Sequence, residues 1–288
     1  MINRIDYKNP GKKADFEIVG LQDFFTTRPT SLIQRDARLN FWAIIFITAG
    51  SGRHSIDFTP HSYSNGDVIF IQKNQVHHFE VNNKAKGYII HINEPFFFRI
   101  EGFNGDIFLE FVDHAFGSPV MPFDLNLGGT NTLLLDLIYR EYRNPDKNFN
   151  IELIASLFQS LILSLRAEIP QTDKIFFSKD YKHFWIFRQL IEEHYTETRY
   201  VEDYAGMMGL TAKTVNQAVR RVVGLSAKQF IKNRIILELK RYLSQGELLN
   251  YEIAEELGFD EAANMTNFFS RNVGMSPKAF RDSIQSGK

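Results

Sequence analysis

Two copies of one eleven-residue stretch decide how the C-terminal half of this chain folds. The first copy, RRVVGLSAKQF, runs from Arg220 to Phe230, and the second, SRNVGMSPKAF, runs from Ser270 to Phe280. Six of the eleven aligned positions are identical, and the copies lie fifty residues apart. A period of this size indicates one supersecondary unit that has been built twice.

Each copy combines the end of one helix with the beginning of the next. A glycine, Gly224 or Gly274, is followed two residues later by a serine, Ser226 or Ser276. The glycines predict left-handed helix stops, and the serines predict N-caps. Ser226 together with Gln229 predicts a capping box.

A short helix, a tight turn and a second helix are predicted upstream of each copy. In the first unit the helices are Val201–Met208 and Ala212–Val223, with the turn at Gly209 and Thr211 as N-cap. In the second unit the helices are Tyr251–Leu257 and Ala262–Asn272. The side chains expected on the inner faces of the second helices are Val215, Val219, Val222, Met265 and Phe269. This pattern is typical of a helix-turn-helix, and two in tandem indicate a protein that reads DNA.

The charged residues of this half are segregated along the chain. From Thr211 to Arg241 there are eight basic residues and one acidic residue, whereas from Tyr242 to Glu261 there are six acidic residues and no basic one. The net charge of −1 for the whole chain does not argue against nucleic acid, because a local basic segment is enough to engage phosphates. The alternative reading of the basic segment is an ordinary solvated helix face.

The composition fits a chain of two or three domains. It has 288 residues, 44% of them hydrophobic, and no cysteine. The lack of cysteine excludes disulfides, thiolate metal sites and cysteine nucleophiles. The N-terminal stretch is polar, and no apolar run reaches the roughly 18 residues of a membrane span. We expect a soluble cytoplasmic protein that makes no contact with a membrane.

The N-terminal part is predicted to be β-rich after a polar, irregular stretch that ends near residue 35. Phe41–Thr48 is apolar on both faces, as expected for a strand buried between two layers. Turn signals separate it from further short strands at roughly ten-residue spacing. The strands predicted after it are Arg53–Phe58, Asp67–Ile71, Val76–Val81 and Lys86–Asn93. This spacing predicts a small antiparallel barrel or sandwich.

Two amphipathic helices are predicted next, packed as a hairpin. Their apolar stripes are Leu133, Leu134, Leu137 and Ile138 in the first helix and Leu153, Leu157, Leu161 and Leu165 in the second. The hairpin has two readings, a cover for the barrel or the contact face of a homodimer. A linker is predicted from Pro170 to Asp180. The expected domains are therefore residues 1–125, residues 126–180 and residues 181–288.

Two motifs stand out in the C-terminal half, Ile253-Ala254-x-x-Leu257-Gly258-Phe259 and Gly274-Met275-Ser276-Pro277-x-x-Phe280-Arg281. On these motifs, this half resembles the DNA-binding domain of the AraC/XylS family of bacterial transcription regulators. It implies a seven-helix domain whose two recognition helices enter adjacent major grooves of double-stranded DNA. The long helix that begins at Ala227 is expected to hold them about one DNA turn, or roughly 34 Å, apart.

The residues that face outward on the two recognition helices are the predicted DNA contacts. They are Lys213, Thr214, Asn216, Gln217, Arg220 and Arg221 on the first helix, and Asn264, Thr266, Asn267, Ser270 and Arg271 on the second. Lys213, Asn216 and Gln217 match the family's base-reading positions; Asn and Gln suit adenine and Lys suits guanine. The arginines are expected to hold phosphates. Asn267 and Ser270 stand where the family has arginine and lysine, so we expect weaker readout by the second unit.

The N-terminal half is similar to the cupin-like sensor barrel of these regulators, on the glycines and strand residues from Gly50 to Phe79. The weak candidates for ligand contacts are Trp42, His54, Phe70, His77 and Tyr88. Metal cupins carry a His-x-His pair, but here His54 is followed by Ser55-Ile56. We therefore expect no metal, no cofactor and no catalytic residue. His77 and His78 point to opposite faces of one strand, so at most one of them enters the barrel.

These observations predict an α+β, multidomain protein, with a cupin-like β-barrel and helical hairpin followed by an all-α tandem helix-turn-helix domain. The function predicted is sequence-specific regulation of transcription under the control of a small-molecule effector. The expected partners are a second copy of the chain, in a homodimer, and RNA polymerase. Two alternatives stay open, a metal-dependent cupin enzyme with a DNA-binding appendage and a constitutive DNA-binding protein whose barrel only dimerises.

Overall fold

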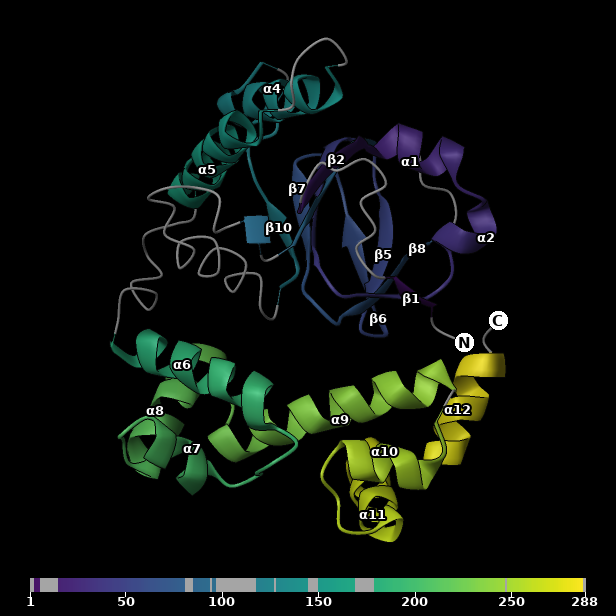
Figure 1. The fold of residues 1–288 in the computed structure, drawn as a ribbon, viewed down its shortest axis with the longest axis vertical. Coiled ribbons are helices and arrows are strands. Elements are labelled where there is room, and N and C mark those ends of the chain that lie inside the picture. The colour runs from purple at the N-terminus through teal and green to yellow at the C-terminus, as the bar shows by residue number, and fades with distance from the viewer. Residues whose placement is uncertain are drawn as a thin grey trace. The chain divides into compact units, whose positions relative to one another are not determined.

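The chain folds into two compact units, one within residues 2–170 and one within residues 171–288 (Figure 1). The computed structural model describes residues 3–5, 15–80, 85–93, 95–96, 118–126, 128–144, 150–168, 179–246 and 248–286. The first unit is rich in β-strands and the second is helical, which confirms the predicted α+β, multidomain class. The three-domain division at residues 125 and 180 stays a prediction.

The N-terminal unit contains two five-stranded sheets. The first sheet has the order β1 (Asn3–Ile5), β3 (Ala37–Leu39), β8 (Val76–Phe79), β5 (Gly52–Ile56) and β6 (Thr59–Tyr63). The second has the order β10 (Val120–Pro122), β7 (Asp67–Ile71), β4 (Trp42–Ala49), β9 (Lys86–Ile92) and β2 (Phe16–Gly20). In the described part of the chain the two sheets do not close into a single barrel, which favours the predicted sandwich form.

The expectation of irregular structure up to residue 35 is wrong. Strand β2 pairs with β9 along its whole length, and two short helices follow it, α1 (Leu21–Thr27) and α2 (Thr30–Ile33). Phe16 and Leu21 are fully buried. The alternation of apolar and polar residues in FEIVG is too short to stand out in a polar stretch, although burial of one face makes it a strand.

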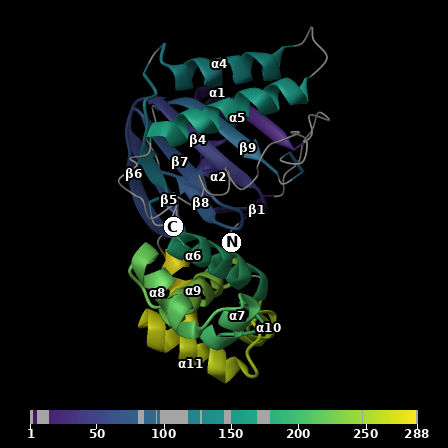
Figure 2. The ribbon, with the colours of Figure 1, turned by 90° about the vertical axis from the view of Figure 1, so that its left-hand side faces the viewer.

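Strand β4 is buried on both faces, as predicted. Ala43, Ile45 and Ile47 lie in the apolar layer between the sheets, whereas Ile44 and Phe46 lie in a second layer with two helices. These helices, α4 (Thr130–Arg143) and α5 (Ile151–Glu168), lie across the outer face of the sheet that carries β4, β7 and β9 (Figure 2). The strand therefore separates two apolar layers, and its side chains alternate between them.

The helices α4 and α5 bury only part of the stripes predicted for them, including Ile138, Leu161 and Leu165. Leu133 and Leu137 are 53% and 48% exposed, while Leu135 and Ile138 are buried. In α5 the buried set is Ile154, Ala155, Phe158, Leu161, Ile162 and Leu165. Apolar residues surround much of both helices, so spacing alone allowed more than one stripe, and contact with the sheet selected another face.

The C-terminal unit contains seven helices within residues 179–246 and 248–286. They are α6 (Lys179–His194), α7 (Val201–Met207), α8 (Ala212–Val223), α9 (Ala227–Gln245), α10 (Asn250–Glu256), α11 (Ala262–Val273) and α12 (Pro277–Ser286). The predicted linker falls outside the described residues except for Lys179 and Asp180, which begin α6. Among the described residues no helix is long and apolar enough to cross a membrane.

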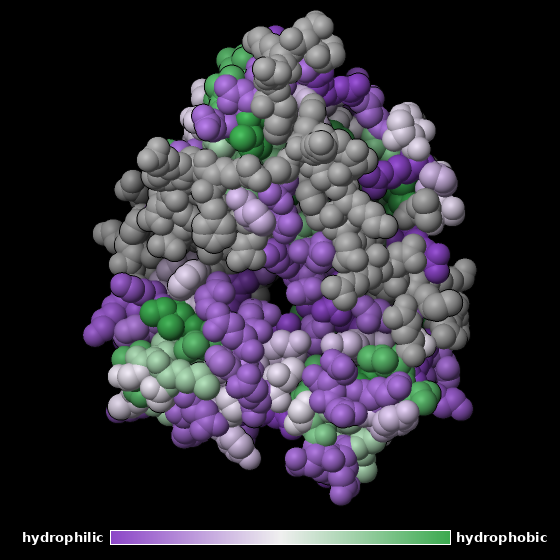
Figure 3. All heavy atoms as spheres, viewed as in Figure 1, coloured by the Kyte–Doolittle hydropathy of each residue, from purple (hydrophilic) through white to green (hydrophobic). Residues whose placement is uncertain are grey.

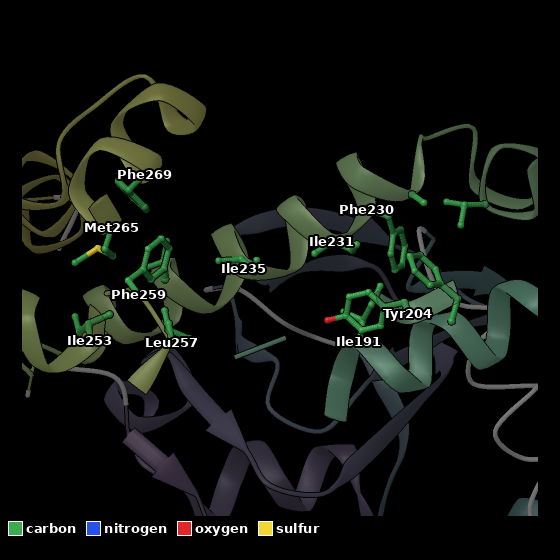
Figure 4. Close-up of a cluster of buried hydrophobic side chains, with 14 of the residues drawn as sticks. Ile191, Tyr204, Phe230, Ile231, Ile235, Ile253, Leu257, Phe259, Met265 and Phe269 are labelled. Atoms are coloured by element: carbon green, nitrogen blue, oxygen red, sulfur yellow. The ribbon is translucent and has the colours of Figure 1, made fainter. Parts of the chain in front are cut away.

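One apolar core runs along α9 and joins both helix-turn-helix units. Its side chains come from α6 to α8 at one end and from α10 to α12 at the other (Figure 4). Ile231 and Ile235 of α9 are 1% exposed and lie between the two groups. Because the core is shared, α9 holds the two units at a fixed separation.

Candidate nucleic-acid interface

The first helix-turn-helix consists of α7 and α8. Gly209 supplies the turn with a φ of 63°, a left-handed conformation that glycine adopts without strain. The Thr211 side chain accepts a hydrogen bond from the Thr214 backbone amide, so Thr211 caps α8 as predicted. Val215 and Val219 are fully buried. The predicted bounds of α8 are confirmed at both ends.

Three exposed side chains form a row on the outer face of α8. Lys213, Gln217 and Arg220 are exposed, and their spacing of four and three residues places them on one side of the helix. No other described residue is recorded as a hydrogen-bond or ion-pair partner of these three side chains. We call this row the α8 triad. It combines a lysine and an amide near the start of the helix with an arginine further along.

Three other predicted contacts of α8 are engaged inside the unit. Asn216 Oδ1 accepts a hydrogen bond from the Ala227 backbone amide at 2.9 Å, which ties α8 to the start of α9. Arg221 forms a 2.5 Å ion pair with Asp180 of α6. The Thr214 hydroxyl lies 2.9 Å from that of Thr211. Asn216, Arg221 and Thr214 therefore have structural roles within the C-terminal unit, which the sequence pattern does not indicate.

The second helix-turn-helix consists of α10 and α11. Met265 and Phe269 are fully buried, as predicted. The outward side chains Asn264, Asn267 and Arg271 are exposed, and those of Thr266 and Ser270 are half-buried. Two exposed acids, Asp260 and Glu261, come directly before α11. Acidic groups at this helix N-terminus oppose the approach of a phosphate, which the N-terminus by itself would attract.

The basic segment exposes fewer charges than its sequence predicts. Arg234 is paired with Glu192 at 2.8 Å and with Glu238 at 2.8 Å, and Arg241 is paired with Glu238 at 3.2 Å. Glu238 and Arg241 are buried. Burial opposes the charge of Arg234, but the carboxylates of Glu192 and Glu238 outweigh it and raise its pKa. Two of the eight basic residues thus stabilise the unit instead of facing a ligand.

Both glycine stops and both serine caps are present. Gly224 and Gly274 have φ values of 72° and 82°. The Ser226 hydroxyl accepts from the Gln229 amide, and the Ser276 hydroxyl accepts from the Ala279 amide. The Gln229 side chain donates to Asn233, so the structure records only the serine half of the predicted capping box.

The segment between α6 and α7 reaches the turn of the second unit, a contact that no sequence pattern indicated. Arg199 donates hydrogen bonds to the carbonyl oxygens of Leu257 and Gly258. Its guanidinium group lies 3.7 Å from the ring centroid of Phe259. A Cβ atom added at Gly258 would lie 1.8 Å from the carbonyl oxygen of Thr196, so the two segments are in direct contact.

The N-terminal unit carries a polar cluster between its sheets. His54 is fully buried, and its Nε2 lies 3.1 Å from Nδ1 of His77. Nδ1 of His91 lies 2.8 Å from a carboxylate oxygen of Glu17. His78 lies on the opposite face of β8 from His77 and pairs with Asp36, as predicted for neighbouring residues of a strand. In the described residues, no group of three or more His, Asp or Glu side chains could hold a metal.

Three of the five predicted ligand contacts lie on the other side of the second sheet. Phe70 is part of the layer against α4 and α5, and Trp42 and Tyr88 pack against the same layer. The Tyr88 hydroxyl donates to Asp136 of α4 at 2.5 Å. The prediction that these three side chains enter the barrel is therefore wrong. His54 and His77 remain as the predicted residues between the sheets.

The buried histidines are expected to make the N-terminal unit less stable below neutral pH. Burial lowers the pKa of His77 to about 3 and that of His54 well below its ordinary value. The unfolded chain binds protons near pH 6.5 and the folded chain does not, so stability falls as the pH drops below 6.5. We expect a loss of about 2 kcal/mol from His77 between pH 7 and pH 5.

Urea unfolding followed by the fluorescence of Trp42, in a Trp185→Phe background, measures this loss. His77→Asn removes one titrating group and should reduce the loss. Glu17, whose pKa is lowered mainly by its hydrogen bond to His91, titrates below this window. An unfolding midpoint that is unchanged from pH 7 to pH 5 would show that the histidines are not held in the neutral form.

Comparisons with known proteins support the assignment of both units. A model of a helix-turn-helix domain matches residues 204–283, and a model of an AraC-like ligand binding domain matches residues 26–162. The chain is 23% identical over 272 residues to the transcriptional activator RhaS of Pectobacterium carotovorum, covering 90% of this chain and 95% of RhaS.

A second relative is the transcriptional activator RhaR of an Enterobacter strain, which is 21% identical over 248 residues and covers 84% of each chain. A crystal structure of ToxT from Vibrio cholerae aligns with 94% of this chain and 99% of its own, with a TM-score of 0.48 and 12% identity. With a tandem helix-turn-helix preceded by the matched ligand-binding domain, the chain belongs to the AraC family of DNA-binding transcription regulators.

Proposed function

We propose that this regulator reads DNA with two unequal recognition helices, of which α8 contributes most of the affinity and specificity. The observation that carries the proposal is the contrast between their outer faces. The α8 triad offers two positive charges and an amide in one exposed row. Helix α11 offers uncharged side chains and one arginine, and it begins next to Asp260 and Glu261. Phosphates favour the first surface and disfavour the second.

Within the triad, the position along the helix indicates the role of each side chain. Lys213 and Gln217 lie near the start of α8, the part of a recognition helix that contacts base edges. We assign a guanine contact to Lys213, an adenine contact to Gln217 and a phosphate contact to Arg220. Asn216 is left out of base reading, since its Oδ1 is bonded to Ala227 and a bidentate adenine contact needs that atom. Arg221 uses Nη1 for its bond to Asp180, so we assign it a phosphate contact through its other guanidinium donors.

For the second helix, we assign the base contacts to the amides of Asn264 and Asn267, flanked by Thr266 and Ser270. Arg271 is assigned to a phosphate. Neutral amides contribute specificity without counterion release, so this half of the site should bind with little dependence on salt. The two helices would then occupy adjacent major grooves.

Replacing Gln217 by alanine tests the reading role directly. We expect relaxed specificity at one base pair, with about 1–3 kcal/mol of discrimination lost there. Selection of duplexes from a random pool by the wild-type and the Gln217→Ala chains measures it. Uniform loss of affinity across all sequences would instead mark Gln217 as a phosphate contact.

We also propose that the chain forms a homodimer through the outer face of α4 and α5. Leu133, Leu137, Leu153 and Leu163 are all more than 40% exposed, and hydrophobic surface gathers over these helices (Figure 3). Large exposed apolar side chains clustered on one helix pair are typical of association surfaces. A dimer would place two DNA-binding units on one operator.

A charge placed on this face is expected to prevent the association. Leu137→Glu should shift the sedimentation behaviour from dimer to monomer at micromolar concentration, because a buried unpaired carboxylate is costly. Leu137 is half exposed in the single chain, so the monomer should stay folded. Ser62→Glu, at an exposed position of β6 in the other sheet, is the control. A dimer that survives Leu137→Glu would place the contact elsewhere.

For regulation, we propose that a small polar effector binds between the sheets beside His54 and His77. The support is a buried imidazole nitrogen, Nδ1 of His54, that has no hydrogen-bond partner among the described residues. Binding would shift the balance between two arrangements of the dimer, and so the placing of its DNA-binding units. The relatives are transcriptional activators, so we further propose action in the cytoplasm through RNA polymerase. We prefer effector binding by the N-terminal unit to an enzymatic role for it.

A further inference from the structure

The inference concerns Arg199, which lies between α6 and α7 and has no place in the proposed DNA contacts. Its Nη2 atom lies 3.0 Å from the Leu257 carbonyl oxygen and 2.9 Å from that of Gly258. These carbonyls belong to the end of α10 and the turn that leads to α11. Peptide carbonyls at the end of a helix have no partner within the helix, so a cation that binds two of them stabilises the turn.

The segment that carries Arg199 is held against the first helix-turn-helix, which consists of α7 and α8. The hydroxyl of Tyr204, a fully buried residue of α7, donates to the carbonyl oxygen of Thr198 at 3.0 Å. The Thr198 side chain in turn accepts from the amide of Tyr200 and bonds to Asp203. The backbone on either side of Arg199 is therefore held by the first helix-turn-helix, and its side chain reaches the second.

A second chain of contacts leads from Arg199 to the recognition helix α11. The guanidinium group stacks on Phe259, and the Phe259 ring meets the ring of Phe268 edge-on with a centroid distance of 5.6 Å. Phe268 is part of α11. The guanidinium group over the Phe259 ring and the contact of this ring with Phe268 restrict its orientation.

We propose that Arg199 is a positioning residue that sets the orientation of α11 relative to α8. Helix α9 holds the two units at a fixed separation, and Arg199 adds a contact outside α9 that resists rotation of the second unit about it. The inference rests on the proposed reading of DNA by both recognition helices. Its consequence is that Arg199 determines whether both helices can enter their grooves at once, without touching DNA itself.

The test compares the full-length wild-type, Arg199→Ala and Arg199→Lys chains on two duplexes. The first duplex is selected from a random pool by the wild-type chain, and the second carries a scrambled sequence in the half contacted by α11. We expect Arg199→Ala to bind the first duplex on the order of tenfold more weakly and the second as wild type does. Arg199→Lys keeps the charge but not the planar group that lies over the Phe259 ring, so the ring loses this contact and the variant should resemble Arg199→Ala.

The dependence of affinity on salt separates positioning from phosphate contact. With a positioning role, the slope of log affinity against log salt concentration stays at the wild-type value in both variants. An equal loss on both duplexes, with a slope reduced by about one, would make Arg199 a phosphate contact and overturn the inference. So would unchanged affinity of both variants for the first duplex.

Thermal unfolding of each variant accompanies the titrations. If Arg199→Ala does not fold, Arg199→Lys and Phe259→Leu give the same comparison. A wild-type chain that binds both duplexes equally well would overturn the proposed use of α11, and the inference with it. If the wild-type chain prefers the first duplex and both Arg199→Lys and Arg199→Ala keep that preference, the positioning role of Arg199 is overturned. The proposed use of α11 then stands.

Discussion

A chain in which Lys213, Gln217 and Arg220 are all replaced by alanine is expected to bind its selected duplex about 100-fold more weakly than wild type. Two base contacts worth about 1–3 kcal/mol each and one phosphate contact are lost together. The three side chains are exposed, so the fold should tolerate their removal. Fluorescence anisotropy with a labelled duplex, at one fixed salt concentration, measures the loss.

The matched control removes the corresponding row from the second recognition helix. Replacing Asn264, Asn267 and Arg271 by alanine should cost only about 30-fold, since the two base contacts of a weaker reader approach the lower end of about 1 kcal/mol each. If α8 is the dominant reader, the triple replacement in α8 lowers the affinity for the duplex more than the triple replacement in α11. Equal losses, or a larger loss from the second, would show that the outer face of α11 reads more than its charges indicate.

Gly258→Ala is expected to destabilise the C-terminal unit by at least about 4 kcal/mol, a loss typical of severe steric conflict. The added Cβ would lie 1.8 Å from the Thr196 carbonyl oxygen, and the φ of Gly258 is 64°. Both the clash and the left-handed conformation oppose a side chain. Urea unfolding followed by Trp185 of α6, in a Trp42→Phe background, measures the loss.

Gly209 is the control, since it lies in the turn of the first helix-turn-helix as Gly258 lies in the turn of the second. Its φ is 63°, but an added Cβ would meet no atom within 4 Å. Gly209→Ala should therefore cost only the about 1–2 kcal/mol of a left-handed alanine. Similar losses for the two variants would mean that the segment at Thr196 does not press on the second turn.

The sequence predicts the first recognition helix accurately because its signals are local. Thr211 caps the helix and Gly224 ends it, and both roles depend on residues within one helical turn. The buried face also follows from spacing, since Val215 and Val219 are apolar while their neighbours are polar. Where the capping residues and the pattern of apolar residues indicate the same helix, a single sequence predicts its bounds and its buried face.

The errors arise where the decisive contact is distant along the chain. Strand β4 is apolar on both faces, so its sequence does not tell which side faces the helices, and Phe70 and Tyr88 were assigned to the wrong layer for the same reason. Leu133 and Leu137 made a plausible stripe, but the sheet packs against a different face of α4.

The sequence does not indicate the partners of polar side chains either. Arg221 pairs with Asp180, and Arg199 binds the carbonyl oxygens of Leu257 and Gly258, across separations of 41, 58 and 59 residues. The charge of an arginine predicts that it binds an acceptor but not which one. The structure therefore separates the basic residues that are paired inside the fold, such as Arg221 and Arg199, from those that we propose for DNA.

The inequality of the two readers is tested most directly by scrambling the DNA one half at a time. Since the chain contains no cysteine, Ala263→Cys provides a unique site on α11 for a DNA-cleaving label that marks the half lying under this helix. The affinity of the wild-type chain is then measured for duplexes with either half scrambled. If α8 is the dominant reader, we expect the greater loss of affinity when the half contacted by α8 is scrambled. A greater loss from the half under α11, or equal losses, would contradict it.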